Sequence, residues 1–156
     1  MNTYRFIGLD AAEFEPLFEL SDDELARRGA KRCVADAKPG FPCRISLEDA
    51  EVGEELLLLP FEHQAAASPY RASGPIFVRR GATQRTMDAA SLPPYVSRRL
   101  MSVRAYDAAH MMIDAAVCEG TAVAAEIERQ LANESVAYLH LHNARRGCFS
   151  CRVERV

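Results

Sequence analysis

The 156-residue sequence has no tryptophan and only two lysines beside 17 arginines. No apolar run approaches the ~20 residues that a membrane-spanning helix requires. The start, MNTYRFIGLD, lacks the basic residues and the apolar stretch of a secretion signal. We therefore expect a cytoplasmic protein with no membrane partner. Its five cysteines are an odd number, which in that compartment predicts free thiols.

Nucleic acids are not the expected partners either. The net charge is −3, and no dense basic stripe interrupts the acidic balance. Residues 1–78 carry 8 basic and 14 acidic side chains, whereas residues 79–156 carry 11 and 8. The sequence contains neither a P-loop nor a G-x-G-x-x-G pattern, so nucleotide binding has no direct support. The abundant arginines do suit bidentate contacts with small anions.

Length and composition predict one domain over residues 1–156. Apolar residues make up 49% and charged residues 26%, which is typical of a globular chain. A chain of this length can bury a core without disulfides or metals. No repeat, low-complexity tract or linker divides it.

Short β-branched and aromatic runs separated by turn residues predict a mainly antiparallel α+β fold. About eight strands in one domain predict a strongly bent sheet or a partial barrel, whose concave side would carry the site. The segments 62–74 and 81–91 are expected to be loops. The expected strands are Thr3–Gly8, Lys31–Ala35, Cys43–Leu47, Glu55–Phe61, Pro75–Arg79, Leu100–Tyr106, His110–Val117 and the two strands within Val136–Val153.

Two to four helices complete the expected fold. The spacing Ser21-x-x-Glu24 is a capping box that predicts a helix over Asp22–Arg28. A second helix is expected to begin at a Thr121 cap and to run to about residue 132. A short third helix is expected to start at the proline pair 93–94 and to reach Ser97 or Arg98.

The segment Val136–Val153 predicts a β-hairpin with its loop at residues 143–147. Because side chains alternate along a strand, the hairpin separates an apolar face from a chemically rich one. The expected register places 138 opposite 152, 140 opposite 150 and 142 opposite 148. The apolar face would contain Ala137, Leu139, Leu141, Phe149, Cys151 and Val153, and the other face Tyr138, His140, His142, Cys148, Ser150 and Arg152.

Three segments together resemble one family of proteins. They are GFPCRISLEDAEVGEELLLLPFEHQ, SPYRASGPIFVR and AYLHLHNARRGCF, and they are similar to the bacterial family called domain of unknown function 1203. The resemblance extends over nearly the whole chain. It implies a small bacterial single-domain protein, and it transfers no catalytic role to any residue.

His140-x-His142 places two imidazoles on one strand face, where they can share a divalent transition metal. His63 is the best candidate for a third ligand, with Glu62 or Cys148 as substitutes. The alternative is that both histidines lie half-exposed on the sheet and bond to neighbouring side chains. If the chain is an enzyme, His140 or His142 would act as a general base or a metal ligand.

The cysteines allow two further interpretations. Cys43 precedes Arg44, and a neighbouring cation activates a thiol, so Cys43 is a candidate nucleophile. The alternative is a buried thiol that acts as a small apolar residue. Cys148-x-x-Cys151 resembles half of a zinc knuckle, but residues three apart on a strand face opposite sides.

The leading hypothesis is a site for a small anionic ligand on the polar face of the sheet. Arginine side chains would hold the anion through paired hydrogen bonds. One alternative is a binding or oligomerisation module, such as a homodimer built on the same face, and another is a thiol-reactive protein acting through Cys43. The sequence leaves open whether the chain is an enzyme. The candidate ligand-binding residues are Tyr138, Arg152, Arg71, Arg44 and Asn143.

Overall fold

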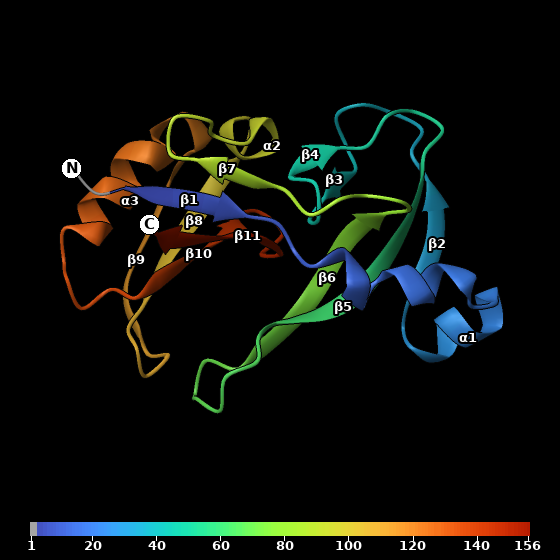
Figure 1. The fold of residues 1–156 in the computed structure, drawn as a ribbon, viewed down its shortest axis with the longest axis horizontal. Helices are drawn as coiled ribbons and strands as arrows, with labels where there is room; N and C mark the ends of the chain where they lie inside the picture. The colour runs from blue at the N-terminus through green and yellow to red at the C-terminus, as the bar shows by residue number, and fades with distance from the viewer. Residues whose placement is uncertain (1–2) are drawn as a thin grey trace.

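The computed structural model describes residues 3–156, and its strands form two sheets (Figure 1). The six-stranded sheet has the order β7-β1-β11-β10-β8-β9, and the five-stranded sheet the order β2-β5-β6-β3-β4. The strands are β1 (Tyr4–Ile7), β2 (Lys31–Val34), β3 (Pro42–Cys43), β4 (Glu48–Asp49), β5 (Glu55–Gln64), β6 (Ala72–Arg79), β7 (Thr86–Asp88), β8 (Leu100–Tyr106), β9 (Met112–Glu119), β10 (Tyr138–Asn143) and β11 (Phe149–Arg155).

Three α-helices and three short 3₁₀ helices accompany the sheets in the described residues. None of these helices has the length and apolar character needed to cross a membrane. The helices are η1 (Ala11–Glu13), η2 (Glu15–Glu19), α1 (Asp22–Arg27), α2 (Pro94–Ser97), η3 (Gly120–Ala122) and α3 (Val123–Leu131).

The mixed α+β, mainly antiparallel character is confirmed, but the expected single sheet of about eight strands is not. The described residues form eleven strands in two separate sheets, with no closed barrel. The extra strands are short. One of them, β7, lies in the segment expected to be a loop and pairs with the edge of β1.

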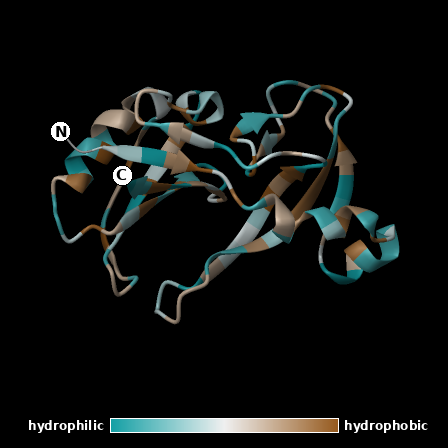
Figure 2. Cartoon of the chain, in the orientation of Figure 1, coloured by the Kyte–Doolittle hydropathy of each residue, from teal (hydrophilic) through white to brown (hydrophobic). Residues whose placement is uncertain are grey.

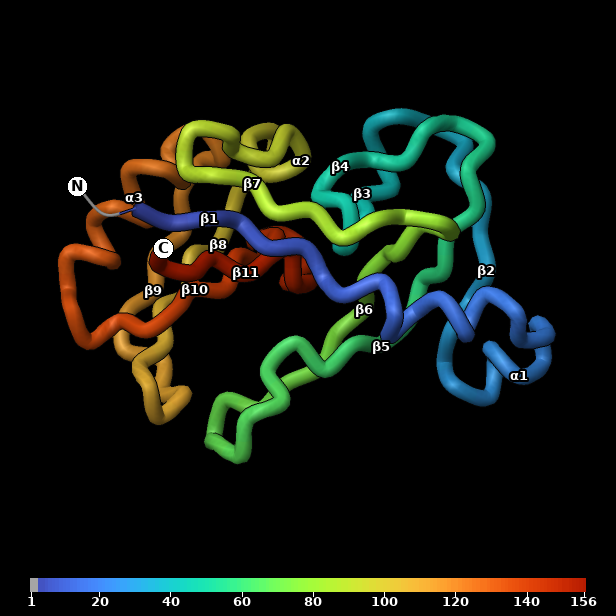
Figure 3. The backbone as a smooth tube through the Cα atoms, viewed as in Figure 1, coloured from blue at the N-terminus to red at the C-terminus, as the bar shows by residue number. Residues whose placement is uncertain are grey.

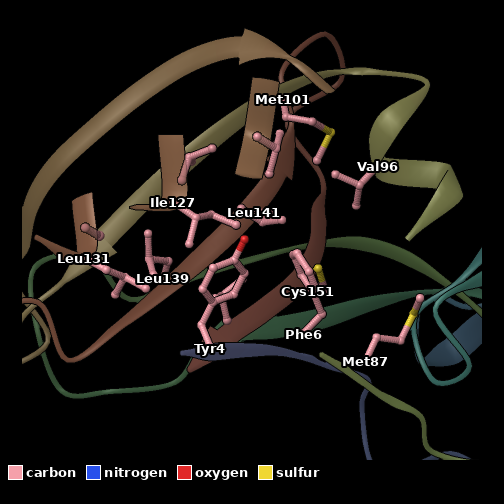
Figure 4. Packing of buried hydrophobic residues seen from close by; sticks show 14 of the residues in the cluster. Tyr4, Phe6, Met87, Val96, Met101, Ile127, Leu131, Leu139, Leu141 and Cys151 are labelled. Atoms are coloured by element: carbon pink, nitrogen blue, oxygen red, sulfur yellow. The ribbon is translucent and has the colours of Figure 1, made fainter. Parts of the chain in front are cut away.

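The core of the six-stranded sheet lies between β10 and helix α3. Ile127 and Leu131 of α3 lie beside Leu139 and Leu141 of β10 (Figure 4). All four side chains are buried. The apolar residues of α3 recur four apart, so they share one face of the helix. This packing directs the leucines of β10 into the core, and its histidines to the opposite side of the sheet.

In the five-stranded sheet, the leucine run at residues 56–59 of strand β5 lies between two apolar clusters (Figure 2). Leu57 and Leu59 pack toward η1, η2 and α1, whereas Leu56 belongs to a small cluster on the other face. Phe149 of β11 joins the first of these clusters. A residue of the six-stranded sheet therefore contributes to the core of the other sheet, and it holds the two together.

Two segments run side by side between the sheets, one following β1 and one leading to β7 (Figure 3). The Gly8 N–H donates to the Arg85 carbonyl oxygen (2.8 Å). A Cβ atom at Gly8 would lie 2.0 Å from the Ile45 carbonyl oxygen. Only glycine at position 8 allows the turn between β3 and β4, which contains Ile45, to approach the segment after β1 this closely.

The structure corrects the expected strand at 43–47 and the expected loop at 62–74. Cys43–Leu47 is not a strand: residues 44–47 form the turn between β3 and β4, and Leu47 adopts a positive φ of 58°. The loop expected at 62–74 is shorter, because β5 continues past Pro60 to Gln64 and Pro60 pairs directly with Pro75. A proline at the end of an apolar run is compatible with a strand when its missing N–H has no ladder partner.

The register of the C-terminal hairpin is also corrected. His140 lies opposite Arg152, and a bulge at residue 150 places His142 opposite Phe149. The bulge contributes an extra residue on β11, which turns the neighbouring side chain to the other face. Phe149 therefore lies on the histidine face, whereas Cys151 and Val153 remain with the leucines as expected.

Helix α1 has the predicted capping box, in which Ser21 Oγ accepts the Glu24 N–H and Glu24 Oε2 accepts the Ser21 N–H. Gly29 ends the segment with φ 72°. The expected Thr121 cap is absent, because α3 begins after the 3₁₀ turn η3 and makes no side-chain cap bond.

We expect Ser21→Ala to lower the free energy of unfolding by about 1 kcal/mol, because an orphaned helix N–H loses its acceptor. Urea denaturation followed by circular dichroism measures the change. Ser91→Ala is the matched control, since Ser91 is exposed and its hydroxyl makes no hydrogen bond in the described part of the chain. Equal unfolding midpoints for the two variants would contradict the capping role.

Candidate functional site

The predicted histidine face exists, but the chain covers it. Tyr138, His140 and His142 lie on one face of β10, at 4%, 2% and 1% exposure. The five-stranded sheet contributes His63 to this face, and Phe149 of β11 also covers it. The interface alternative needs this face exposed, whereas here the two sheets meet over it.

The structure brings His63 to the His140/His142 pair, as the metal hypothesis required. The ring centroid of His63 lies 4.7 Å from that of His142 and 6.3 Å from that of His140. His63 also stacks on Phe149, with ring planes 7° apart. Residues more than 70 positions apart in the sequence thus form one imidazole cluster.

Each imidazole of the cluster has one buried nitrogen without a hydrogen-bond partner: His63 Nδ1, His140 Nδ1 and His142 Nε2. His142 Nδ1 lies 2.9 Å from the Gly147 carbonyl oxygen. A carbonyl only accepts, so Nδ1 carries the proton and Nε2 the lone pair. Nevertheless, no group of three or more His, Cys, Asp or Glu side chains in residues 3–156 is placed to hold a metal ion.

Burial lowers the pKa of each of these histidines. The pKa of His140 falls to about 2 and that of His142 to about 3, first through loss of solvent. The neighbouring imidazoles and arginines, including Arg104 and Arg152, add to the shift in His140. The imidazoles are therefore neutral at pH 7, and they act as polar packing groups rather than cationic anchors.

Three of the five predicted ligand-binding residues lie outside the cavities described below. The Arg152 guanidinium covers the Tyr138 ring at 4.0 Å, and the Tyr138 hydroxyl bonds to Gln64 (2.9 Å) and His110 (2.7 Å). Arg71 is exposed and paired with Glu62 at 3.0 Å. These side chains already have partners within the chain.

The other two, Arg44 and Asn143, line a cavity of about 410 Å³ near the junction of the sheets. The turn between β3 and β4 contributes Arg44, and the end of β10 contributes Asn143. Strands β5 and β6 add an apolar wall. The cavity is lined by Gly40, Pro42, Arg44, Leu58, Pro75, Ile76, Phe77, Arg99, Asn143, Arg146 and Cys148, and we call it the Arg44 pocket.

Arg44 is the most unusual residue of the Arg44 pocket, because its charge is 2% exposed and has no carboxylate partner. Nε donates to the Phe149 carbonyl oxygen (2.8 Å) and Nη1 to that of Pro42 (2.7 Å). Nη2 points to Cys148 Sγ at 3.5 Å. No acidic side chain among residues 3–156 forms an ion pair with Arg44.

Cys148 lies at the meeting point of two of these donors. Besides Arg44 Nη2, the Asn143 amide Nδ2 donates to its sulfur at 3.2 Å. The backbone holds this arrangement, because the Asn143 N–H bonds to the Cys148 carbonyl oxygen (2.9 Å) and the Gly147 N–H bonds to that of Asn143 (2.8 Å). Gly147 adopts φ 83°, which closes the turn.

A second cavity, of about 420 Å³, adjoins the Arg44 pocket and shares Arg99, Asn143 and Arg146 with it. Glu119 is the one carboxylate among the residues that line the two cavities. The sequence reasoning missed Arg99 and Arg146, although each belongs to an Arg-Arg pair. One pair ends the short helix α2, and the other fills the turn beside Cys148.

The cysteine candidates separate clearly in the structure. Cys43 is 0% exposed, and its sulfur accepts the Arg79 N–H at 3.3 Å, so solvent does not reach it. Cys151 is buried in the core, and burial raises its pKa to about 12. All five cysteines are free thiols. The cysteine whose sulfur lies next to the Arg44 guanidinium is Cys148, which is 104 positions away in sequence. Cys43, the neighbour of Arg44 in sequence, is buried.

The comparisons with known proteins add one finding. Searches of curated proteins and of solved structures gave no significant match. The family model described as "Protein of unknown function (DUF1203)" matches residues 40–155, a span that includes Arg44, Asn143 and Cys148. Because the matched segment covers most of the 156 residues, and as its sequence segments indicated, the chain belongs to the DUF1203 family.

Proposed function

We propose that this chain binds a small organic anion in the Arg44 pocket. The observation that carries the proposal is the buried Arg44 guanidinium, which has hydrogen-bond acceptors but no counter-charge. The anion is therefore expected in this cavity and not on the neighbouring histidine face, which the chain covers. Arg44 and Asn143 remain the proposed ligand-binding residues.

The energetics of Arg44 favour an anionic occupant. A guanidinium remains charged at any physiological pH. Removing such a charge from water costs several kcal/mol unless an opposite charge compensates for it. The carbonyls of Phe149 and Pro42 satisfy two of its donors but supply only dipoles. A bound carboxylate or phosphate would supply the missing negative charge.

The walls of the Arg44 pocket indicate the kind of anion. Arg99 and Arg146 stand on the polar side, and Arg146 has no ion pair or hydrogen bond within the described residues. Leu58, Ile76 and Phe77 form the opposite, apolar side. A volume of about 410 Å³ lies within the ~300–1,000 Å³ of small-molecule sites. The fitting ligand is an acid with an apolar body.

Isothermal titration with benzoate, inorganic phosphate and neutral benzamide tests the proposal. We expect benzoate to bind best, because it combines a carboxylate with an apolar ring, and benzamide not to bind. Arg146→Gln should weaken benzoate binding about tenfold or more, since a charge-assisted hydrogen bond contributes about 1.5–3 kcal/mol.

Arg27→Gln is the matched control, because it removes the same charge from the exposed end of α1. It should leave the affinity unchanged. Equal affinities for benzoate and benzamide would refute the anion site. An equal loss of benzoate affinity in the two arginine variants would refute the position of the site in the Arg44 pocket.

A further inference from the structure

The position of Cys148 makes its sulfur the candidate nucleophile of the Arg44 pocket. Its side chain is half-buried and lines the cavity. Its sulfur receives N–H groups from Arg44 and Asn143, at 3.5 and 3.2 Å. A thiolate, rather than a thiol, attacks electrophiles, and a cation beside the sulfur is typical of reactive cysteines. The buried guanidinium is held at that place by its two carbonyl contacts.

No other cysteine of the described chain has such surroundings. Cys43 and Cys151 are 0% and 1% exposed. Cys33 and Cys118 are partly exposed, but burial raises the pKa of both thiols, and two glutamates raise that of Cys118 further. Cys33 and Cys118 therefore provide two internal comparators of similar exposure.

We propose that Cys148 reacts with small anionic disulfides that enter the Arg44 pocket. This inference rests on the proposed function, because the same arginines would hold the carboxylates of the disulfide. The thiolate attacks one sulfur of R–S–S–R, a Cys148–S–S–R bond forms, and R–S⁻ leaves. One disulfide is consumed and one is formed, so no other oxidant is needed. Cys148 is thus a site of reversible mixed-disulfide modification by acidic thiol compounds.

The residues that line the Arg44 pocket would have different roles in this exchange. Arg44 and Asn143 hold the attacking sulfur, whereas Arg146, which has no ion pair or hydrogen bond within the described residues, would meet the incoming anion. The apolar wall of Leu58 and Phe77 accommodates an uncharged part of the disulfide.

The experiment compares the dianionic reagent 5,5′-dithiobis(2-nitrobenzoate) with the neutral reagent 4,4′-dithiodipyridine on the folded full chain. Released thiol gives the rates, and peptide mass mapping assigns them to cysteines. With the anionic reagent, Cys148 should react about tenfold faster than Cys33 or Cys118, as expected for a cationic cleft that concentrates an anion. With the neutral reagent this advantage should fall several-fold, to the part that comes from the raised pKa of the Cys33 and Cys118 thiols and not from the charge of the reagent.

Arg146→Gln should reduce the preference of Cys148 for the anionic reagent several-fold, whereas Arg27→Gln should leave it unchanged. The preference should also fall as salt is added, because exposed charges are screened. The inference is overturned if Cys148 reacts no faster than Cys118, or if both reagents show the same ratio of rates.

Cys148→Ser separates this inference from the proposed function. The variant cannot react at position 148, but it keeps the arginines and should still bind benzoate. Benzoate binding together with an unreactive Cys148 in the native chain would overturn the inference and leave the anion site standing. Loss of benzoate binding in both proteins would overturn the anion site itself.

Discussion

Lowering the pH from 7 to 5 is expected to destabilise the folded chain by about 3–4 kcal/mol, because the folded state cannot protonate His140 and His142. Their pKa values are about 2 and about 3 in the folded protein, against about 6.5 in the unfolded chain. Above pH 6.5 both states hold neutral imidazoles, so the contribution to stability is fully present there. As the pH falls below 6.5, only the unfolded chain takes up protons.

The slope follows from the number of protons. Each of the two histidines costs about 1.4 kcal/mol of stability for every pH unit below 6.5. The loss continues until the pH approaches the folded values near 3. The groups that act on His140 and His142 are imidazoles, arginines and the Gly147 carbonyl. No carboxylate is among them, so none stabilises an imidazolium at these positions.

Urea denaturation at pH 7, 6 and 5 measures this dependence. His140→Gln should reduce the slope by about 1.4 kcal/mol per pH unit, because one titrating group is removed. Ser91→Ala is the control, since Ser91 is exposed, its hydroxyl makes no hydrogen bond in the described residues, and it carries no group that titrates in this range. It should leave the slope unchanged. An identical slope in wild type and His140→Gln would show that buried imidazole does not control the acid response.

The histidine cluster shows what alternation along one strand can predict. The period of two separates the leucines of β10 from its histidines, and this separation survived the error in register. The hairpin bulge did not appear in that pattern, because one extra residue at Ser150 changes the pairing without changing composition. Phe149 is therefore the residue whose face was predicted wrongly.

The two sheets were harder to predict than their strands. The sequence shows where β5 and β6 lie, but the order of the five-stranded sheet depends on pairings between distant segments. Strands β3 and β6 join through a single parallel pair, Cys43 and Phe77. A pairing of one residue with one residue leaves no periodic pattern in the sequence. The division of the strands into two sheets therefore appears only in the three-dimensional structure.

The Arg44 pocket illustrates the limit for sites. Local sequence suggested that Arg44 would act on the adjacent Cys43. In the structure residue 44 lies in a turn, where its side chain crosses to the hairpin loop and contacts Cys148. The pair at 145–146 lies within the predicted hairpin loop, and the pair at 98–99 lies between a predicted short helix and a predicted strand. Similar pairs occur at 27–28 and 79–80, so the doubling alone did not indicate the site.

Gly120→Ala is expected to destabilise the folded chain by about 3 kcal/mol or more, because the added side chain has no room. Its Cβ would lie 2.1 Å from the Val96 carbonyl oxygen, 2.6 Å from that of Ser97 and 2.7 Å from that of Arg99. All three contacts are with backbone, which cannot rotate away as a side chain does. Overpacking typically costs about 1–3 kcal/mol, and three simultaneous backbone contacts place this variant at the upper end or beyond it.

Gly74→Ala is the matched control for the same substitution. Gly74 lies in β6, and an added Cβ there meets no atom within 4 Å. Alanine in a strand interior is favoured over glycine by roughly 0.5–1 kcal/mol, so this variant should be neutral or slightly more stable. Urea denaturation compares the two variants, and equal stabilities would contradict the close packing of η3 on the end of α2.

The effect of Gly120→Ala should also reach the Arg44 pocket. Relief of the three contacts requires the backbone at residues 96–99 to move, and Arg99 is the last residue of this segment. Arg99 is held by its bond to the Tyr95 carbonyl oxygen (2.6 Å), so its guanidinium would move with the helix. Benzoate binding should weaken in the folded fraction of Gly120→Ala and remain unchanged in Gly74→Ala. Unaltered benzoate binding in both variants would show that the position of α2 does not affect the anion site.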